Sequence, residues 1–152
     1  MDQHFKVEAQ AAPERLFPIV ADLGRYPELL DIVHRVEPAE PGPDGRPAWL
    51  VTLRAKLGPF ARSKRLRMVR TELDEPYRVR FERAELDGRD HSSWVLEAQV
   101  EPAATASPSQ RSAVTMALAY GGTLWTSALE GLLRDQVTDA VARLDALAAI
   151  PA

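Results

Sequence analysis

Residues 120–150 read YGGTLWTSALEGLLRDQVTDAVARLDALAAI. After Gly121-Gly122, apolar side chains recur at helical spacing on one face, and charged side chains occupy the other. This pattern predicts one amphipathic helix over residues 123–150, with Thr123 as its N-cap and a length of roughly 40 Å. A helix of this kind cannot bury its apolar stripe alone. We therefore expect it to lie along the concave face of a sheet that the preceding residues form.

Seven upstream segments alternate between apolar and polar residues, which is typical of half-buried strands. They are residues 5–10, 32–40, 49–56, 61–73, 77–82, 94–100 and 114–120. Turn signals separate many of them, at residues 41–45, 58–59, 74–76 and 87–88, and residues 102–110 are expected to form a loop. Short turns between consecutive strands predict an antiparallel sheet. Two short helices, from Pro13 to about Gly24 and from Tyr26 to Leu30, are expected after the first strand.

The composition excludes several classes of protein. The chain has 152 residues, no cysteine and a formal net charge of −3. Its length suits one domain over residues 1–152. Without cysteine there is no disulfide, thiol nucleophile or thiolate metal site, and the separated residues His4, His34 and His91 predict no metal or cofactor. The charge gives no overall attraction to nucleic acid or to an anionic membrane.

The expected location is the cytoplasm. Residues 1–6 lack the apolar stretch of a signal peptide. The uncharged residues 112–129 contain too many Ser, Thr and Gly residues for a membrane span. We therefore predict a cytoplasmic protein with no integral membrane segment.

Three short stretches carry a family resemblance. Residues 20–28 read VADLGRYPE, residues 78–81 read RVRF and are followed by Asp87-Gly88 and Trp94, and residues 120–122 read YGG. They resemble, respectively, the junction of the two short helices, the central hairpin and the last turn of polyketide cyclase/dehydrase and coenzyme-Q-binding members of the START-like (SRPBCC, Bet v 1-like) superfamily. The resemblance covers essentially the whole chain.

The resemblance implies an α+β helix-grip fold. About seven strands form a curved antiparallel sheet, with two short helices after strand 1 and a long C-terminal helix packed on the concave face. Relatives of this fold bind lipids, quinones, polyketides or other hydrophobic molecules, and a minority are cyclases or aromatases.

A curved sheet around a helix leaves an apolar concave space, which is the usual site for a small ligand. Alternation along the strands and the helical period select the inward-facing residues, each of which could also pack the core without touching a ligand. The predicted cavity residues are Trp49, Val51, Leu53, Leu66, Met68, Val79, Phe81, Trp94, Leu96, Met116, Leu118 and Tyr120 from strands, and Trp125, Leu129, Leu132 and Leu133 from the helix.

Charged residues also continue the inward faces. Beyond Phe81, the alternation reaches Arg83 and Glu85, and before Leu66 it reaches Lys64 and Arg62. A buried charge is costly unless it is paired, so these residues either lie solvated at strand ends or form a polar cluster that orients a ligand carbonyl or carboxylate. The candidates for catalysis are Glu85, Arg83 and Tyr120, and the candidate hydrogen-bond donors are Tyr26, Tyr120 and Trp125.

A basic run leaves a third possibility open. Five basic residues and no acidic residue lie between Ala61 and Arg70, and Arg78 and Arg80 could extend their outer patch. The run is either a solvated strand face with cross-strand pairs to Glu72 and Glu82, or a surface for an acidic or phosphate-bearing partner. Aromatic residues do not interleave with it, so nucleic acid is not expected.

Three functions remain open. The first is a carrier or sensor of a hydrophobic small molecule, the second a polyketide cyclase or aromatase, and the third an interaction module that uses the basic strand face. Neither the ligand nor the oligomeric state follows from the sequence.

Overall fold

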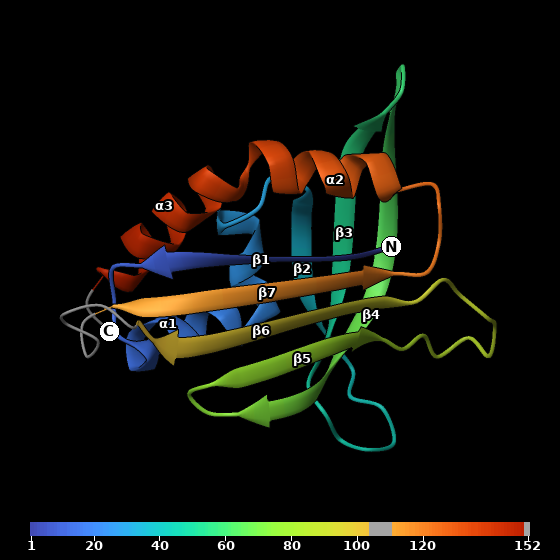
Figure 1. Ribbon diagram of the computed structural model, residues 1–152. Helices are drawn as coiled ribbons and strands as arrows, with labels where there is room; N and C mark the ends of the chain where they lie inside the picture. The colour runs from blue at the N-terminus through green and yellow to red at the C-terminus, as the bar shows by residue number, and fades with distance from the viewer. Residues whose placement is uncertain (104–110, 151–152) are drawn as a thin grey trace.

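A seven-stranded antiparallel sheet forms the centre of the computed structural model, which describes residues 1–103 and 111–150 (Figure 1). The strands in chain order are β1 (Asp2–Ala9), β2 (Val33–Ala39), β3 (Ala48–Leu57), β4 (Phe60–Asp74), β5 (Arg78–Arg83), β6 (Trp94–Pro102) and β7 (Ser112–Tyr120). They lie in the order β1-β7-β6-β5-β4-β3-β2. The predicted strands are confirmed with ends shifted by a few residues, and most of the predicted loop over 102–110 lies outside the described residues.

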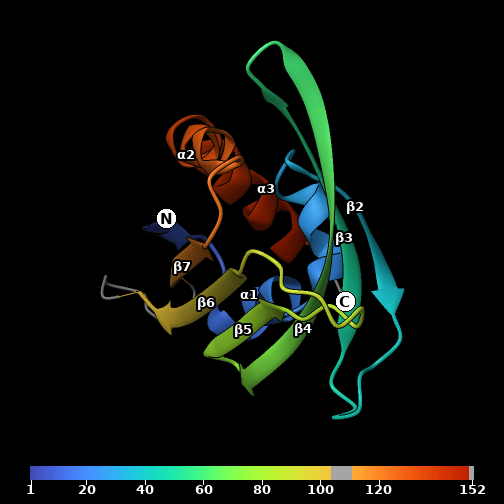
Figure 2. The ribbon, with the colours of Figure 1, turned by 90° about the vertical axis from the view of Figure 1, so that its right-hand side faces the viewer.

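The sheet is bent, and β4 carries the bend. This strand is 15 residues long and pairs with β3 along its first part and with β5 along its last part. The register shifts between Arg70 and Glu72, opposite β5, and an irregularity of this kind increases local twist. Figure 2 shows β4 sweeping from one half of the sheet to the other, so that the sheet wraps around the helices.

Two short helices follow β1, as predicted. Helix α1 (Pro13–Val20) begins at Pro13, whose missing N–H costs nothing in the first helical turn. The second is a 3-10 helix, η1 (Leu23–Glu28), which begins three residues before the predicted start at Tyr26. The Asp22 carboxylate accepts the Gly24 N–H at 2.9 Å and caps η1. Gly24 therefore lies inside η1 and does not end α1.

The C-terminal helix is divided, which corrects the prediction of one helix over 123–150. Helix α2 spans Thr126–Asp135 and helix α3 spans Val137–Ala148, with Gln136 between them at φ −117°. Leu129 and Leu132 are buried in α2, and Leu144 and Ala148 in α3. If the segment were one straight helix with 3.6 residues per turn, the buried face of the first pair and that of the second would point in directions roughly a third of a turn apart. The break lets both halves bury their apolar faces against a curved sheet.

The start of α2 also differs from the prediction. Trp125 occupies the N-cap position, and Thr123 lies two residues earlier, where its carbonyl accepts the Thr126 N–H at 3.2 Å. The predicted N-cap at Thr123 is therefore wrong. The N-terminal half of the uncharged stretch 112–129 forms β7, and the rest turns into α2.

The helices lie on the concave side of the sheet (Figures 1 and 2). Helix α2 contacts β3, and α3 contacts β1 and α1. Helices α2 and α3 thus bridge the two halves of the sheet, whose edge strands are β1 and β2. In the part of the chain that is described, no helix is both long and apolar enough to cross a bilayer.

Candidate functional site

An apolar cavity of about 100 Å³ lies between the sheet and helices α2 and α3. The lining comes from η1 and its exit, from five strands and the start of β2, and from both C-terminal helices. The lining residues are Phe5, Leu23, Tyr26, Leu30, Ile32, Val33, Val51, Leu53, Leu66, Met68, Trp94, Leu96, Met116, Leu118, Leu129, Leu132, Val137 and Ala140. Almost every side-chain atom in this set is carbon, so the cavity is chemically suited to a hydrophobic group.

The strand alternation placed many of these residues correctly on the inner face. The predicted residues in the lining are Val51, Leu53, Leu66, Met68, Trp94, Leu96, Met116, Leu118, Leu129 and Leu132. Their contact with a ligand stays a prediction. The side chain of Leu133 lies outside the described residues.

Five predicted cavity residues lie outside this lining. Val79 and Phe81 are fully buried, and Tyr120 and Trp125 are nearly so. Trp49 packs edge-on against Phe81, with ring centroids 5.7 Å apart. The four buried side chains fill the space that the bend of the sheet would otherwise leave, and Trp49 packs at the edge of this group.

Sequence reasoning missed the residues that close the cavity from the first strand, η1 and α3. They are Phe5, Leu23, Leu30, Ile32, Val33, Val137 and Ala140. Phe5 alternates inward in β1, and this signal was available. The residues around η1 follow no period of 2 or 3.6, so only the tertiary position of this segment brings them to the cavity.

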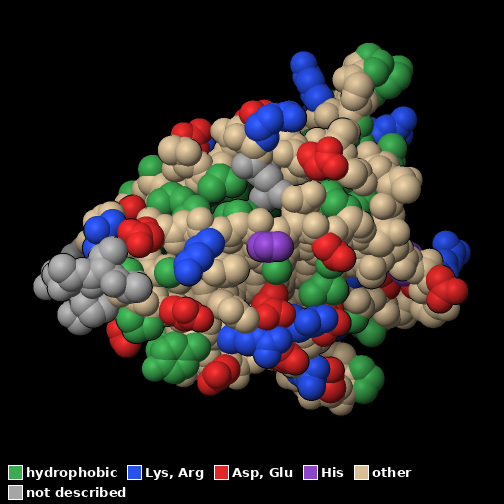
Figure 3. Space-filling view, viewed as in Figure 1, with side chains coloured by type: hydrophobic (Ala, Val, Ile, Leu, Met, Phe, Trp, Pro, Cys, Tyr) green, Lys and Arg blue, Asp and Glu red, His purple; other side chains and the backbone are tan. Residues whose placement is uncertain are grey.

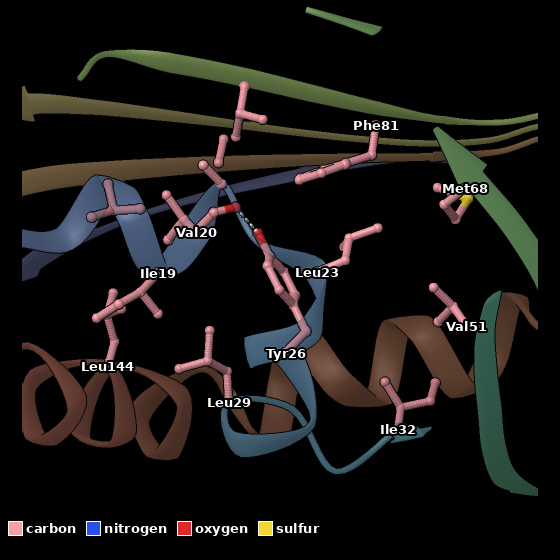
Figure 4. Close-up of a cluster of buried hydrophobic side chains, with 14 of the residues drawn as sticks. Ile19, Val20, Leu23, Tyr26, Leu29, Ile32, Val51, Met68, Phe81 and Leu144 are labelled. Carbon is pink, nitrogen blue, oxygen red and sulfur yellow. Dashed lines mark hydrogen bonds between the residues drawn. The ribbon is translucent and has the colours of Figure 1, made fainter. Parts of the chain in front are cut away.

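Tyr26 lines the cavity, but its hydroxyl group makes a hydrogen bond within the fold. Its O–H donates to the Val20 carbonyl at 2.8 Å, the bond drawn in Figure 4. Burial raises the pKa of Tyr26, and the charge of Asp22 adds to the effect. The phenol is therefore neutral and already paired, and it joins η1 to the end of α1.

The indole N–H of Trp94 is a buried donor without a partner in the part of the chain that the structure describes. The residue lines the cavity and is only 4% exposed. Its Nε1 is buried and has no hydrogen-bond partner among the described residues. The ring is fixed by Tyr120, with centroids 4.4 Å apart, and by Trp125 at 6.5 Å. Buried donors are normally paired. The Trp94 N–H is therefore an unsatisfied polar group on a residue of the cavity lining.

A second, smaller hollow of about 50 Å³ adjoins the cavity on the α1 and α3 side. The two hollows share Phe5, Tyr26, Leu30, Met116 and Ala140 in their linings. An apolar cavity of about 150 Å³ is large enough to hold benzene. A ligand larger than a small group therefore requires the shared side chains to move and join the two spaces.

The predicted charged cluster is present beside the cavity wall. Arg83 Nε lies 3.6 Å from a Glu85 carboxylate oxygen, and the two side chains are 7% and 17% exposed. Arg83 donates to the Ser92 carbonyl at 3.2 Å, and Glu85 accepts the Arg67 N–H at 2.9 Å. Burial and the charge of Arg83 lower the pKa of Lys64, against the opposite effect of Glu85. Arg83 and Glu85 are therefore largely shielded from solvent, although Arg83 Nε has no hydrogen-bond partner among the described residues, and neither side chain is in the cavity lining. Arg62 does not join this cluster, because it is exposed.

Tyr120, the third candidate for catalysis, lies behind Trp94. Its hydroxyl oxygen accepts the Trp125 N–H at 3.4 Å, and its ring packs on Trp94. In this position Tyr120 supports the turn from β7 into α2. A role toward substrate for Glu85, Arg83 or Tyr120 stays a prediction.

Comparison with known proteins supports the fold and places the chain in a family. A START superfamily protein from Mycobacterium smegmatis aligns with a TM-score of 0.68 and 16% identity, over 96% of this chain and 98% of that one. A protein from Thermus thermophilus aligns with a TM-score of 0.68 and 20% identity, over 97% of both chains.

A di-domain aromatase/cyclase, BexL from the BE-7585A biosynthetic pathway, aligns with a TM-score of 0.59 and 15% identity. The alignment covers all of this chain and 51% of BexL. No curated protein matches the chain. The family described as polyketide cyclase / dehydrase and lipid transport matches residues 4–149, nearly the whole chain. The chain therefore belongs to the polyketide cyclase / dehydrase and lipid transport family and has its START-like helix-grip fold.

Proposed function

We propose that this protein binds a hydrophobic small molecule in the cavity beneath α2 and α3, as a carrier or sensor. The single observation that carries the proposal is an apolar hollow whose one unpaired lining donor, among the described residues, is Trp94 Nε1. Apolar cavities with a few polar groups that fix orientation are the usual form of a small-molecule site. The family description, which includes lipid transport, supports the same function.

The unpaired donor narrows the chemistry of the ligand. A buried N–H without a partner costs roughly 1–3 kcal/mol. A ligand that presents a carbonyl oxygen to Trp94 recovers this cost, whereas a pure hydrocarbon does not. The proposed ligand is therefore an apolar molecule with a hydrogen-bond acceptor, such as a ketone, an ester or a quinone.

Binding is favoured over cyclisation by the position of the titratable groups. General acid–base catalysis requires a side chain within hydrogen-bond reach of the reacting atoms. Among the described lining residues, Tyr26 alone can titrate, and its hydroxyl already bonds to Val20. Glu85 and Arg83 lie within ion-pair distance of each other, each hydrogen-bonds to the backbone, and both lie outside the lining.

The first experiment identifies the natural ligand. The purified protein is analysed by untargeted mass spectrometry for small molecules that co-purify with it. We expect an apolar compound that carries at least one carbonyl or ester oxygen. If the protein carries no apolar compound and binds neither of the probes below, the proposed function is wrong.

The second experiment tests Trp94 with two probes of nearly the same shape. Acetophenone has a carbonyl group where α-methylstyrene has a C=CH₂ group, and calorimetry measures the affinity of each. We expect Trp94→Phe to weaken acetophenone binding about tenfold, because one hydrogen bond of roughly 1.4 kcal/mol is lost. Binding of α-methylstyrene should change less than twofold.

Trp49→Phe is the matched control, because Trp49 is half-buried and outside the lining. It should leave the affinity for both probes unchanged. Equal loss of both probes in Trp94→Phe would mean that the ring shapes the cavity and that its N–H has no role in recognition. A loss of acetophenone affinity in Trp49→Phe as large as in Trp94→Phe would contradict the assignment as well.

A further inference from the structure

The hairpin of β3 and β4 projects beyond the rest of the molecule. Figures 1 and 2 show it rising past α2, and its turn is Gly58-Pro59. Phe60, directly after the turn, is 63% exposed, the largest value among the described large hydrophobic residues. An aromatic side chain at the end of a projecting hairpin contributes nothing to the core. The position of Phe60 therefore indicates a contact with a surface outside this chain.

Basic residues surround this end of the hairpin. Arg54, Lys56, Arg62 and Arg65 are all exposed. Arg65 lies 3.9 Å from Glu37, whereas the other three have no acidic partner within ion-pair distance among the described residues. No acidic residue occurs between Asp44 and Glu72. We call residues 54–65 the hairpin tip.

The strand register places these charges on both faces of the hairpin tip. Leu57 pairs with Phe60 and Ala55 with Arg62, so Phe60 and Arg62 share one face. Lys56 and Arg54 point to the opposite face, because side chains alternate along a strand. The tip therefore has an apolar end with cations behind it on either side, which Figure 3 shows as hydrophobic side chains at the end of a projection flanked by Lys and Arg side chains.

Three neighbouring basic residues of the sheet do not belong to this surface. Arg78 and Arg80 form ion pairs with Glu72, Glu82 and Glu97. Arg67 is buried and donates to the carbonyl groups of Glu40 and Ala84. The patch suggested by the basic run is thus concentrated at the hairpin tip, although the whole chain carries a net charge of −3.

We propose that the hairpin tip docks on the surface of an anionic lipid bilayer, with Phe60 at the acyl boundary and Arg54, Lys56 and Arg62 at the phosphate groups. Two residues along a strand separate Arg62 from Phe60, a distance of roughly 7 Å. Apolar side chains of interfacial segments enter a bilayer by roughly 5–10 Å. A cation at this separation therefore lies at the headgroups when the aromatic ring is buried.

A soluble polyanion would need only the cations of the hairpin tip. The exposed ring of Phe60 favours a partner that also offers an apolar region, as a lipid bilayer does. The inference goes beyond the proposed ligand binding and does not depend on it. The base of the same hairpin supplies Val51, Leu53 and Leu66 to the cavity lining. Docking through the tip would hold the cavity directly above the lipid surface.

The test is sedimentation with vesicles of phosphatidylcholine, alone or mixed with phosphatidylglycerol. We expect binding only to the anionic vesicles, and weaker binding as salt is raised, because salt screens exposed charges. Each basic residue near an anionic surface is worth roughly fivefold in binding. Lys56→Glu with Arg62→Glu should therefore weaken binding by about 30-fold or more. Phe60→Ser should weaken it by about tenfold or more, because an apolar ring no longer leaves water.

Matched control variants carry the same changes elsewhere. Lys6→Glu with Arg89→Glu changes the net charge equally at two exposed sites, and Tyr77→Ser removes another half-exposed aromatic ring. Both controls should bind the anionic vesicles like the wild type. Circular dichroism and thermal melts establish that all of the variants are folded.

Phe60→Trp tests the depth of the ring. Lipids brominated on their acyl chains should quench the new tryptophan in the presence of anionic vesicles. The wild type should change little, because its tryptophans are buried or half-buried and lie outside the hairpin tip.

Several results would overturn the proposal. One is that the wild type fails to bind anionic vesicles at low salt. Another is that the control Lys6→Glu with Arg89→Glu loses as much vesicle binding as Lys56→Glu with Arg62→Glu. If Phe60→Ser binds as tightly as the wild type while the charge reversal abolishes binding, the tip is a polyanion site without an apolar contact. If sedimentation velocity shows a dimer that Phe60→Ser dissociates, the tip is an interface between two copies of the chain.

Discussion

Three residues decide how the cavity wall meets the C-terminal helices. Trp94 and Tyr120 are directly opposite each other in β6 and β7, and Gly122 follows Tyr120 at the turn into α2. A Cβ atom at Gly122 would overlap the hydroxyl group and ring of Tyr120. The ring cannot move away easily, because Trp94 packs on it. Glycine is thus required here for close approach and not for its backbone angles.

This contact predicts opposite effects at two glycines. Gly122→Ala should lower the free energy of unfolding by about 1–3 kcal/mol, because the added methyl group overpacks the turn. Gly131→Ala, in α2, should raise it by about 1 kcal/mol, because the new Cβ meets only ordinary contacts and alanine favours a helix. Urea unfolding measures both. A neutral Gly122→Ala would mean that Tyr120 can shift without cost.

At the scale of elements, charged residues connect β4, β5 and β6 on the outer face. Arg78 bonds to the Glu97 carboxylate at 2.8 Å, and Arg80 approaches the same group at 3.3 Å. Glu72 pairs with Arg78 from β4 at 2.8 Å. The sequence predicted cross-strand pairs to Glu72 and Glu82, and the pair of Glu72 with Arg78 is found, whereas Glu82 pairs with Arg80 of its own strand. The prediction missed Glu97, because β6 becomes a neighbour of β5 only in the sheet.

The network predicts a pH dependence of stability. The hydrogen bond from Arg78 holds the pKa of Glu97 below its ordinary value of 4.5. The stabilisation by Glu97 is therefore complete above about pH 4.5 and is lost as the pH falls through the lower pKa of the folded state. Glu97→Gln should be less stable than the wild type at neutral pH, and the two should converge in acid. Glu101→Gln, at an exposed site of the same strand, is the control. Parallel pH profiles for the wild type and Glu97→Gln would contradict this assignment.

At the scale of the whole molecule, the cavity leaves the core less densely packed and therefore less stable than a filled core would be. Ala140, on α3, borders both hollows, and a larger side chain there would fill space that is now empty. Filling a cavity typically adds about 0.5–2 kcal/mol of stability. Under the proposed function, this stability is left unused because the empty space is kept for the ligand.

Ala140→Leu tests this relation between stability and binding. We expect the variant to unfold at a higher urea concentration, by about 1 kcal/mol, and to lose affinity for both acetophenone and α-methylstyrene. Ala142→Leu, on the exposed side of the same helix, should change neither property appreciably. If Ala140→Leu keeps full affinity, the ligand binds elsewhere.

Local patterns in the sequence were enough to predict the seven strands, the first helix, the apolar stripe of the C-terminal segment and the inward side of most strands. The reason is that periods of 2 and 3.6 residues record which side of each element meets the core. The family resemblance added how these elements are arranged.

No such pattern predicts which inward residues surround empty space and which fill it, because this depends on how the elements pack together. Val79 and Phe81 alternate inward like Leu66 and Met68, yet only the latter two reach the cavity. The division of the helix at Gln136 and the unpaired Trp94 N–H depend on this packing as well. These features depend on distances between residues far apart in the chain, which the curvature of the sheet sets and no local pattern contains.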